Sequence, residues 1–430
     1  MRAMRCRLIA IALLAGAFTR ASAQVQVPVS APAATVIRAG VLVDPESGNA
    51  STNQTIVVVN GIITAVGPNA TAPPGASMID LSRSVVLPGL FDAHTHLCMD
   101  VNLERDAANY FYTTLRDSDS YRAVEGVVNA RAMLDAGFTT VRDVGNEGNF
   151  ACVSVRMAIQ QGKFAGPTMI TAGRILAPYG GQFHLQPDRP ELAEPEYAVA
   201  DTRDEMLKAV RENIHFGAGV IKIVVDDQPY IYSTDDIRFI VEEAAKAGLK
   251  VAAHVWTRQG AHNAAAAGVA SLEHLEAIAD EDLEVAKRSG VTAVFTPFPM
   301  ASLQQFSTPE RAKMDYDQQM DRLRAARRIG VPIAFGTDVI AELPGMNRGT
   351  TAIQWIDSYT TAGFSPRDIL RVMTTNAAKL LGVDKERGAI RPQMAADIIA
   401  TDGNPLQDID ALKRITFVMK NGRVVKERAN

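Results

Sequence analysis

Residues 90–96 of the chain read LFDAHTH, an apolar stretch that ends in two histidines. Successive side chains of a β-strand point to opposite faces, so residues two apart share a face. We therefore expect His94 and His96 to project together from the end of one strand. An isolated pair of this kind is often no more than a polar strand end, so its meaning depends on the segments that follow.

Seven further apolar segments follow, and helical patterns lie between them. One helical pattern, residues 233–248, begins with a Ser/Thr/Asp cap and ends at Gly248. Strands that alternate with helices are typical of a parallel sheet covered by helices. We predict an α/β fold with a closed (β/α)8 TIM barrel over residues 87–387, and a doubly wound open sheet is the alternative. The seven segments are TTVRDVG (139–145), GPTMITAGRIL (166–176), GVIKIVVD (219–226), LKVAAHVW (249–256), VASLEHLE (269–276), VTAVFTP (291–297) and VPIAFGTD (331–338).

Both ends of the chain also read as strands. Residues 34–89 contain three segments rich in β-branched residues, and residues 396–427 contain a matching pair. The dipeptides Asn60–Gly61 and Asn421–Gly422 are hairpin signals. We predict a smaller β-sandwich domain built from residues 24–86 and 388–430, with the barrel inserted between its two pieces.

Polar residues recur at the ends of the predicted barrel strands, where barrels of this kind carry their active sites. They are His94, His96, Lys222, His254, His274 and Asp338. Each one alone has an ordinary explanation, such as a core histidine, a helix cap or a lysine with a buried stem. Their joint placement at strand ends favours a metal site, because imidazole and carboxylate are good zinc ligands.

The chain resembles the metal-dependent amidohydrolase superfamily over nearly all residues after position 23. The motifs that carry the likeness are PGLFDAHTH, GVIKIVVD, VAAHVW, SLEHLE, FGTD and MTTNAAKLLGV. Within the superfamily, the chain is similar to the branch of imidazolonepropionase-like peptidases and prolidases, which includes ochratoxin-degrading amidohydrolases. One departure is Met394, where relatives often have Gly, and it concerns the β domain rather than the site.

The resemblance implies two divalent metal ions, usually zinc. The two histidines of the HTH stretch and Asp338 would hold one ion, and His254 and His274 the other, with N6-carboxylated Lys222 as the bridge. An ammonium group cannot bind a metal ion, but reaction with CO2 turns lysine into a carboxylate. Two such ions can share a hydroxide that attacks a substrate carbonyl, and Asp338 would carry the proton to the leaving amine. Mononuclear deaminases of the superfamily lack this lysine, so Lys222 counts against them.

Two further residues are catalytic candidates with weaker support. His184 lies in the long segment 178–197, and long loops often cover a site. It would hydrogen-bond the substrate, and a surface histidine is the alternative. Tyr232 matches a family tyrosine that contacts substrate, with ordinary loop packing as the alternative. We expect Arg142 and Asp143 to form a supporting ion pair.

These features predict an exported, binuclear metal-dependent hydrolase of C–N bonds. The expected substrate is a dipeptide, an N-acyl amino acid or an ochratoxin-type amide, each with a free C-terminal carboxylate. Because the same hydroxide attacks any activated carbonyl, a lactone or ester hydrolase is the first alternative. A non-catalytic periplasmic metal or solute binder is the alternative of another class, and Asp338 argues against it because binding needs no proton shuttle. The resemblance also implies a homo-oligomer, with an octamer as one size.

The start of the chain predicts export. Residues 1–7 are basic, residues 8–18 are apolar, and Ala21–Ala23 offers small residues for cleavage. We expect a signal peptide of residues 1–23 and a secreted or periplasmic protein without membrane association after cleavage. A net charge of −4 without a basic cluster argues against nucleic-acid binding. For Cys98 and Cys152, both a disulfide and two buried thiols remain open.

Overall fold

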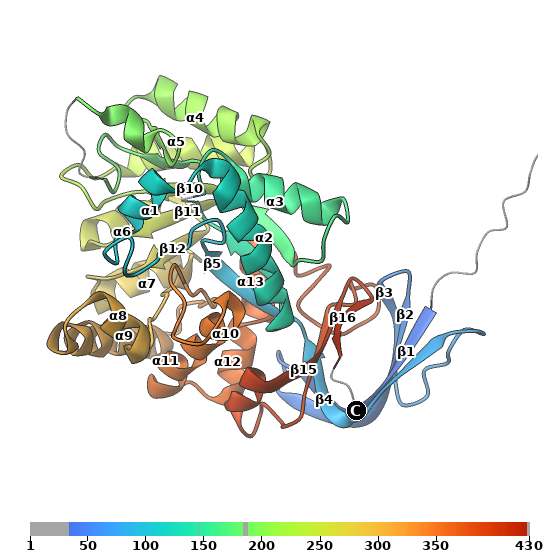
Figure 1. The fold of residues 1–430 in the computed structure, drawn as a ribbon. Helices are drawn as coiled ribbons and strands as arrows, with labels where there is room; N and C mark the ends of the chain where they lie inside the picture. The colour runs from blue at the N-terminus through green and yellow to red at the C-terminus, as the bar shows by residue number, and fades with distance from the viewer. Residues whose placement is uncertain (1–33, 146, 184–187, 428–430) are drawn as a thin grey trace, which may run out of the picture. The chain divides into compact units, whose positions relative to one another are not determined.

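In the computed structural model of the protein, the strands form two parallel sheets and one mixed sheet (Figure 1). The structure describes residues 34–145, 147–183 and 188–427, so the predicted signal peptide and His184 lie outside the described residues. The parallel sheets have the orders β5-β6-β7 and β13-β12-β11-β10-β8-β9. Their strands are β5 (Leu90–Thr95), β6 (Phe138–Asp143), β7 (Thr168–Thr171), β8 (Ile175–Ala177), β9 (Tyr197–Val199), β10 (Ile221–Val224), β11 (Val251–Val255), β12 (Ser271–His274) and β13 (Thr292–Val294).

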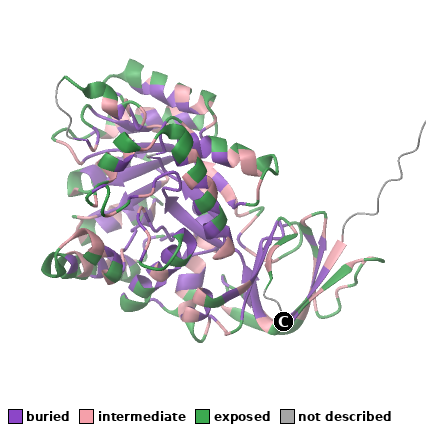
Figure 2. Cartoon of the chain, in the orientation of Figure 1, coloured by how far each residue is buried: buried purple, intermediate pink, exposed green. Residues whose placement is uncertain are grey.

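Helices separate most of these strands, as the sequence pattern predicts, and the strands are the buried elements (Figure 2). Ser233 caps the start of α5 as predicted, and Gly248, with φ 73°, follows its end. None of the described helices is both long and apolar enough to cross a membrane. The helices are α1 (Tyr110–Arg116), α2 (Asp119–Asp135), α3 (Ala151–Gln160), α4 (Arg203–His215), α5 (Thr234–Ala245), α6 (Arg258–Ala267), α7 (Asp280–Arg288), α8 (Met300–Phe306), α9 (Pro309–Ile329), α10 (Arg348–Ala352), α11 (Ile356–Thr361), α12 (Pro366–Val372) and α13 (Thr375–Leu381).

The third predicted strand differs from the structure. Residues 166–176 divide into β7 and β8, which belong to different sheets. Gly173 lies between them with φ 72°, a left-handed conformation that glycine adopts without a steric penalty. A side chain there would meet Phe150 and Asn213 within 3 Å, so the chain turns where only glycine fits.

The eighth predicted strand, residues 331–338, is an extended segment with one isolated bridge, Ala293 to Ile333. Its other edge follows β5, because the backbone N–H of Asp338 donates to the carbonyl of His94 at 2.9 Å. At Gly336 an added Cβ would lie 2.8 Å from Cβ of His94, so glycine permits this close approach. The segment therefore connects β13 to β5 and brings Asp338 to the histidine pair.

The two ends of the chain meet in one seven-stranded sheet, drawn in blue and red in Figure 1. The order is β16-β15-β14-β4-β1-β2-β3. These hydrogen bonds make a single sheet rather than two separate ones, so the sandwich and its boundaries stay predictions. The strands are β1 (Ala34–Asp44), β2 (Asn49–Val59), β3 (Ile62–Gly67), β4 (Ser77–Pro88), β14 (Ile398–Thr401), β15 (Ile415–Lys420) and β16 (Arg423–Glu427).

Both predicted hairpin turns are confirmed. Asn60 and Gly61 have φ values of 50° and 83°, and Asn421 and Gly422 have 48° and 75°. Positive φ at both central residues matches the twist of the flanking strands. Met394, 2% exposed, fills the apolar core of this sheet, so the larger side chain is buried where relatives often have glycine.

Candidate active site

The predicted metal ligands line one cavity of about 200 Å³ at the strand ends. They are His94, His96, Lys222, His254, His274 and Asp338. The ring centroids of His94 and His274 lie 4.7 Å apart, and those of His254 and His274 lie 4.6 Å apart. Ligand atoms of His94, His274 and Asp338 all lie within 4.8 Å of one another. The structure thus brings together residues from β5, β10, β11, β12 and the segment 331–338.

Hydrogen bonds on the far side of each ring orient the histidine pair. Nδ1 of His96 lies 2.7 Å from the carbonyl oxygen of Gly145, and Nδ1 of His94 lies 2.7 Å from Oε2 of Glu273. Both oxygens accept, so both Nδ1 atoms carry the proton. Nε2 then points to Asp338 Oδ1, 3.0 Å away from His96 and 3.6 Å away from His94. This is the arrangement of metal-binding histidines.

Two imidazole nitrogens of the site are buried without a hydrogen-bond partner in the described part of the chain, and carboxylate oxygens of Asp338 and Asp227 lie 3.6 and 3.8 Å from them. The two nitrogens are Nε2 of His94 and Nε2 of His254. Buried polar atoms in folded proteins are normally hydrogen-bonded, so an orphaned pair calls for a partner. A divalent cation is the partner that neutral imidazole nitrogens bind best. The donor set therefore fits a metal ion.

The electrostatics of the cavity favour ligands in their metal-binding state. Burial lowers the pKa of His94, His254 and His274 well below the ordinary value, which keeps these imidazoles neutral. Burial acts the same way on His96, but the hydrogen bond with Asp338 and the charges of Asp338 and Asp143 together outweigh that effect and raise the pKa of His96. Burial also lowers the pKa of Lys222 to about 8. The neutral amine, which is the form that reacts with CO2, is thus accessible near neutral pH.

The loop after β5 is fixed from three helices. Arg122 and Asn129 of α2 donate to the carbonyls of Cys98 and Leu97, each at 2.9 Å. Arg348 of α10 donates to the carbonyls of His96 and Met99, also at 2.9 Å. Cys98 is joined by a disulfide to Cys152 of α3, with a Cα–Cα distance of 5.8 Å. The structure therefore selects the disulfide, which the sequence left open.

Two of the predicted ligands have a strained backbone. His274 and Asp338 have φ values of 68° and 58°, in the left-handed region that non-glycine residues rarely adopt. Such conformations cost about 1–3 kcal/mol each and cluster at functional sites. Nothing in the sequence signals them, because histidine and aspartate are ordinary at strand ends.

The side chains of Tyr232 and Arg142 make contacts other than those expected from the sequence. The hydroxyl of buried Tyr232 donates to the carbonyl of Ala200 at 2.6 Å, as in ordinary loop packing, and Tyr232 is not among the described lining residues. The prediction that Arg142 and Asp143 form an ion pair is wrong. Arg142 pairs with Glu273 at 2.7 Å, and Asp143 accepts the backbone N–H of Leu97 at 2.6 Å.

The rest of the cavity wall is largely apolar. Its residues come from loops and strand ends far apart in the sequence, which is why periodicity did not find them. They are Met99, Tyr110, Ile175, Trp256, Phe298 and Ile340. Polar Gln182, Thr296 and Glu276 also line the cavity, and Glu276 pairs with Arg322 at 2.9 Å. A wall of this kind suits an apolar substrate group that is fixed by a few polar contacts.

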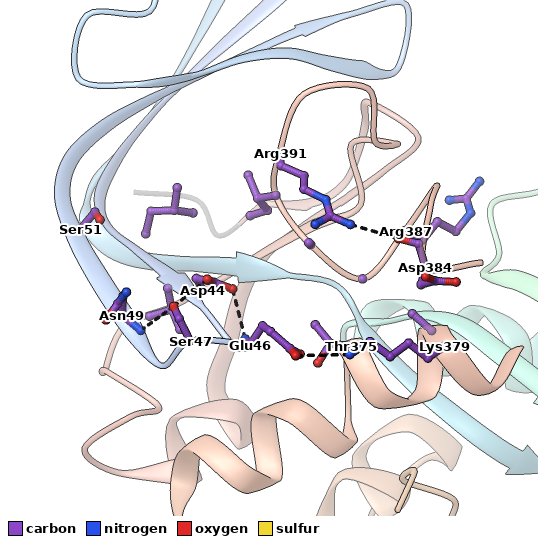
Figure 3. A pocket seen from close by; sticks show the side chains of 16 residues that line it. Asp44, Glu46, Ser47, Asn49, Ser51, Thr375, Lys379, Asp384, Arg387 and Arg391 are labelled. Carbon is purple, nitrogen blue, oxygen red and sulfur yellow. Dashed lines mark hydrogen bonds and ion pairs between the residues drawn. The ribbon is translucent and has the colours of Figure 1, made fainter. Parts of the chain in front are cut away.

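A larger cavity, of about 490 Å³, lies elsewhere, between the turn after β1 and helix α13 (Figure 3). Its charged groups contact one another. Lys379 lies 3.2 Å from Glu46, and Arg391 donates to the carbonyl of Asp384 at 3.3 Å. We assign the chemistry to the smaller cavity, because its lining, unlike that of the larger cavity, includes a group of possible metal ligands whose atoms converge.

A parallel α/β framework with imidazoles and a carboxylate at its strand ends defines a metal-dependent hydrolase. Residues 85–425 match the amidohydrolase family, and the chain belongs to that family. It is accordingly a metal-dependent hydrolase of C–N bonds.

Individual relatives agree with the likeness seen in the motifs. Ochratoxinase of Aspergillus niger is 30% identical over 431 residues, 91% of this chain and 86% of that protein. Imidazolonepropionase of Paracoccus denitrificans is 26% identical over 402 residues, 84% of this chain and 91% of that protein. The crystal structure of a Xaa-Pro dipeptidase with bound methionine is similar with a TM-score of 0.81 and 28% identity, over 92% of this chain and 100% of that chain.

Proposed function

We propose that the protein is an exported amidohydrolase with two divalent metal ions, which cleaves the amide or peptide bond next to a C-terminal amino acid. One observation carries this proposal. Four imidazoles, Asp338 and Lys222 share one cavity, while Nε2 of His94 and of His254 are buried without a hydrogen-bond partner among the described residues. The imidazole-rich donor set favours zinc.

The two ions would share the ligands as follows. The histidine pair after β5 and Asp338 would hold the first, and His254 and His274 the second. N6-carboxylated Lys222 would join them, and its lowered pKa supports this because CO2 reacts with the neutral amine. When bound, two such ions lower the pKa of a water molecule and polarise the carbonyl of the scissile amide.

Asp338 is suited to move the proton. Its side chain is 19% exposed, which leaves it open to the cavity, and Oδ1 lies 3.0 Å from Nε2 of His96. A carboxylate in this place can accept the proton of the attacking water and deliver it to the leaving amine nitrogen. A protein that merely binds metal or solute would have no use for this step.

The cavity wall supports a substrate with an apolar acyl group. Trp256 is 45% exposed and stacks near His254, with ring centroids 6.0 Å apart. Phe298 lines the same cavity, so an aromatic or aliphatic group finds contact. Lys222 is the one lysine or arginine among the described lining residues, and Tyr110, Gln182 and Thr296 add polar groups that can donate to a substrate carboxylate. His184 stays a further proposed donor, and it lies outside the described residues.

We also infer that the two parallel sheets belong to one closed (β/α)8 barrel, with the β module as a two-layer domain. Two observations support closure. The segment 331–338 connects β13 to β5, and the N–H of Gly219, just before β10, donates to the carbonyl of Thr171 in β7 at 2.7 Å. A closed barrel leaves no unpaired strand edge.

Export and self-association complete the proposal. A disulfide between Cys98 and Cys152 supports an oxidising compartment, and mass spectrometry of the exported protein should show a chain that begins at Gln24. Exposed Tyr121, Val124 and Val128 share one face of α2 and support a homo-oligomer, which light scattering would test.

The direct test is a substrate screen with zinc-loaded protein. Carboxypeptidase substrates, N-acyl amino acids and ochratoxin-type amides should be hydrolysed, and lactones and simple esters should be hydrolysed more slowly. Faster turnover of lactones would make the protein a lactonase, and no turnover of any class, with zinc bound, would favour a binding protein.

A further inference from the structure

A buried chain of polar side chains joins three strands behind the histidine pair. Nδ1 of His94 lies 2.7 Å from Oε2 of Glu273, and Oε1 of Glu273 lies 2.7 Å from Nη2 of Arg142. Ser271 donates to Glu273 and accepts from Nη1 of Arg142 at 2.9 Å. His94, Glu273 and Ser271 are 0% exposed and Arg142 is 3% exposed, so these contacts are made without bulk water.

We propose that Glu273 is a positioning residue, which fixes the ring of His94 for metal binding, and that Arg142 holds Glu273 in place. This inference rests on the proposed metal site. A carboxylate can only accept, so the proton of His94 stays on Nδ1 and the lone pair on Nε2 faces the cavity. Arg142 compensates the negative charge of Glu273, which burial would otherwise make costly.

The backbone explains how one strand end serves both purposes. In a regular strand, neighbouring side chains point to opposite faces. His274 departs from this rule with φ 68°. As a result, Glu273 bonds the ring of His94 at 2.7 Å, while the next residue, His274, places its own ring centroid 4.7 Å from that of His94. Because of this conformation, two consecutive residues of β12 serve the same site. His274 supplies a predicted ligand, and Glu273 hydrogen-bonds another predicted ligand, His94.

The two histidines of the pair differ in the support they receive. His96 donates to the neutral carbonyl of Gly145, whereas His94 donates to a carboxylate. A charged acceptor makes an imidazole a stronger donor to a metal ion, and loss of such a partner typically lowers metal affinity about 10–100-fold. The effect should fall on the ion that His94 binds and spare the other.

The test measures zinc affinity rather than activity. Glu273→Gln keeps the size of the side chain but removes its charge, and competition with a chromophoric chelator should show about 10–100-fold weaker binding at one of two sites. In cobalt-substituted protein the visible ligand-field bands should shift. The matched control is Asp397→Asn, because buried Asp397 pairs with Lys420 at 2.6 Å in the terminal sheet, away from the histidines. It should bind zinc like the wild type.

Wild-type affinity in Glu273→Gln would overturn the inference, and so would an equal loss in both variants, which would indicate general destabilisation. If Glu273→Gln does not fold, Glu273→Asp is the second variant. It keeps the charge that Arg142 pairs with, but one methylene less prevents it from reaching both partners. Normal zinc affinity in folded Glu273→Asp would also overturn the inference. A wild-type protein that takes up no zinc would instead refute the proposed function.

Discussion

Two cavities of this protein differ in how their polar groups are satisfied. In the one of about 490 Å³, beside the turn after β1, Glu46 contacts Lys379, and Arg391 donates to the carbonyl of Asp384 (Figure 3). In the smaller one, Nε2 of His94 and Nε2 of His254 are buried without a hydrogen-bond partner among the described residues. Convergent imidazole nitrogens of this kind, rather than volume, therefore distinguish the site of chemistry.

The same contrast appears in the charges. Glu46 and Lys379 have side chains 47% and 56% exposed, so water screens them. In the smaller cavity, burial keeps three imidazoles neutral and lowers the pKa of Lys222 to about 8. Perturbed groups that converge in a cavity mark a functional site more reliably than a large opening does.

Replacement of Lys222, in the smaller cavity, should have the largest effect on metal content and activity. We expect Lys222→Ala to reduce the metal content from about two ions per chain to about one, because the shared bridging ligand is lost. Activity should fall below detection, and short-chain carboxylic acids should restore part of it. Elemental analysis after loading in bicarbonate measures the change. A wild-type protein that is fully active with one ion would contradict the binuclear site.

Substitution of Asp338 distinguishes a role in catalysis from a role in metal binding within the smaller cavity. Asp338→Asn still offers an oxygen to the metal but cannot carry a proton. We expect kcat and kcat/KM to fall together by about 10²–10⁴-fold, as for loss of a group that acts in the transition state. Steady-state kinetics with metal analysis of the same sample measures this. If turnover stays near normal, the proton shuttle is another group, and His184 is the next residue to replace.

The sequence predicted which residues share the smaller cavity because their positions follow a local rule. His94 and His96 share a strand face by spacing alone, and the remaining four predicted ligands lie in segments that already read as strands. The alternation also predicted the α/β class, and the Asn–Gly dipeptides predicted both hairpin turns. These features depend on a few neighbouring residues, so a single sequence carries them.

Contacts between residues far apart in the sequence leave no local pattern. Arg142 was predicted to pair with its neighbour, but Glu273, 131 positions away, is the partner because the sheets bring β6 and β12 together. Tyr232 was placed on the right loop, yet the path of that loop turns its hydroxyl to Ala200. The left-handed φ of His274 likewise arises from packing. Long-range pairing, rather than propensity, decides such details.

Loss of the disulfide should have a smaller effect, and it should change the stability of the protein rather than its catalytic activity. Cys98 and Cys152 are 54 positions apart, and loss of a disulfide of a folded domain typically costs about 2–5 kcal/mol. We expect Cys98→Ser with Cys152→Ser to lower the free energy of unfolding in urea by about that amount. Reducing agent should lower the stability of the wild type and leave the double variant unchanged. Equal stability of both oxidised proteins would show that the bond does not form.

A substitution in the larger cavity should have the smallest effect on activity and stability. It tests most directly whether the two cavities differ in function. Glu46→Gln removes a carboxylate that lies 3.2 Å from Nζ of Lys379. Because both side chains are about half exposed, the pair should contribute less than about 1 kcal/mol to the free energy of unfolding. Thermal and urea unfolding should therefore change little, and kcat/KM should stay at the wild-type value because Glu46 is not among the residues that line the smaller cavity. Lys379→Met is the matched variant, and the two single effects with the double variant give the coupling between the partners. A tenfold fall in kcat/KM in Glu46→Gln with unchanged metal content would show that the larger cavity takes part in the reaction, and satisfied polar groups would then no longer mark a cavity without function.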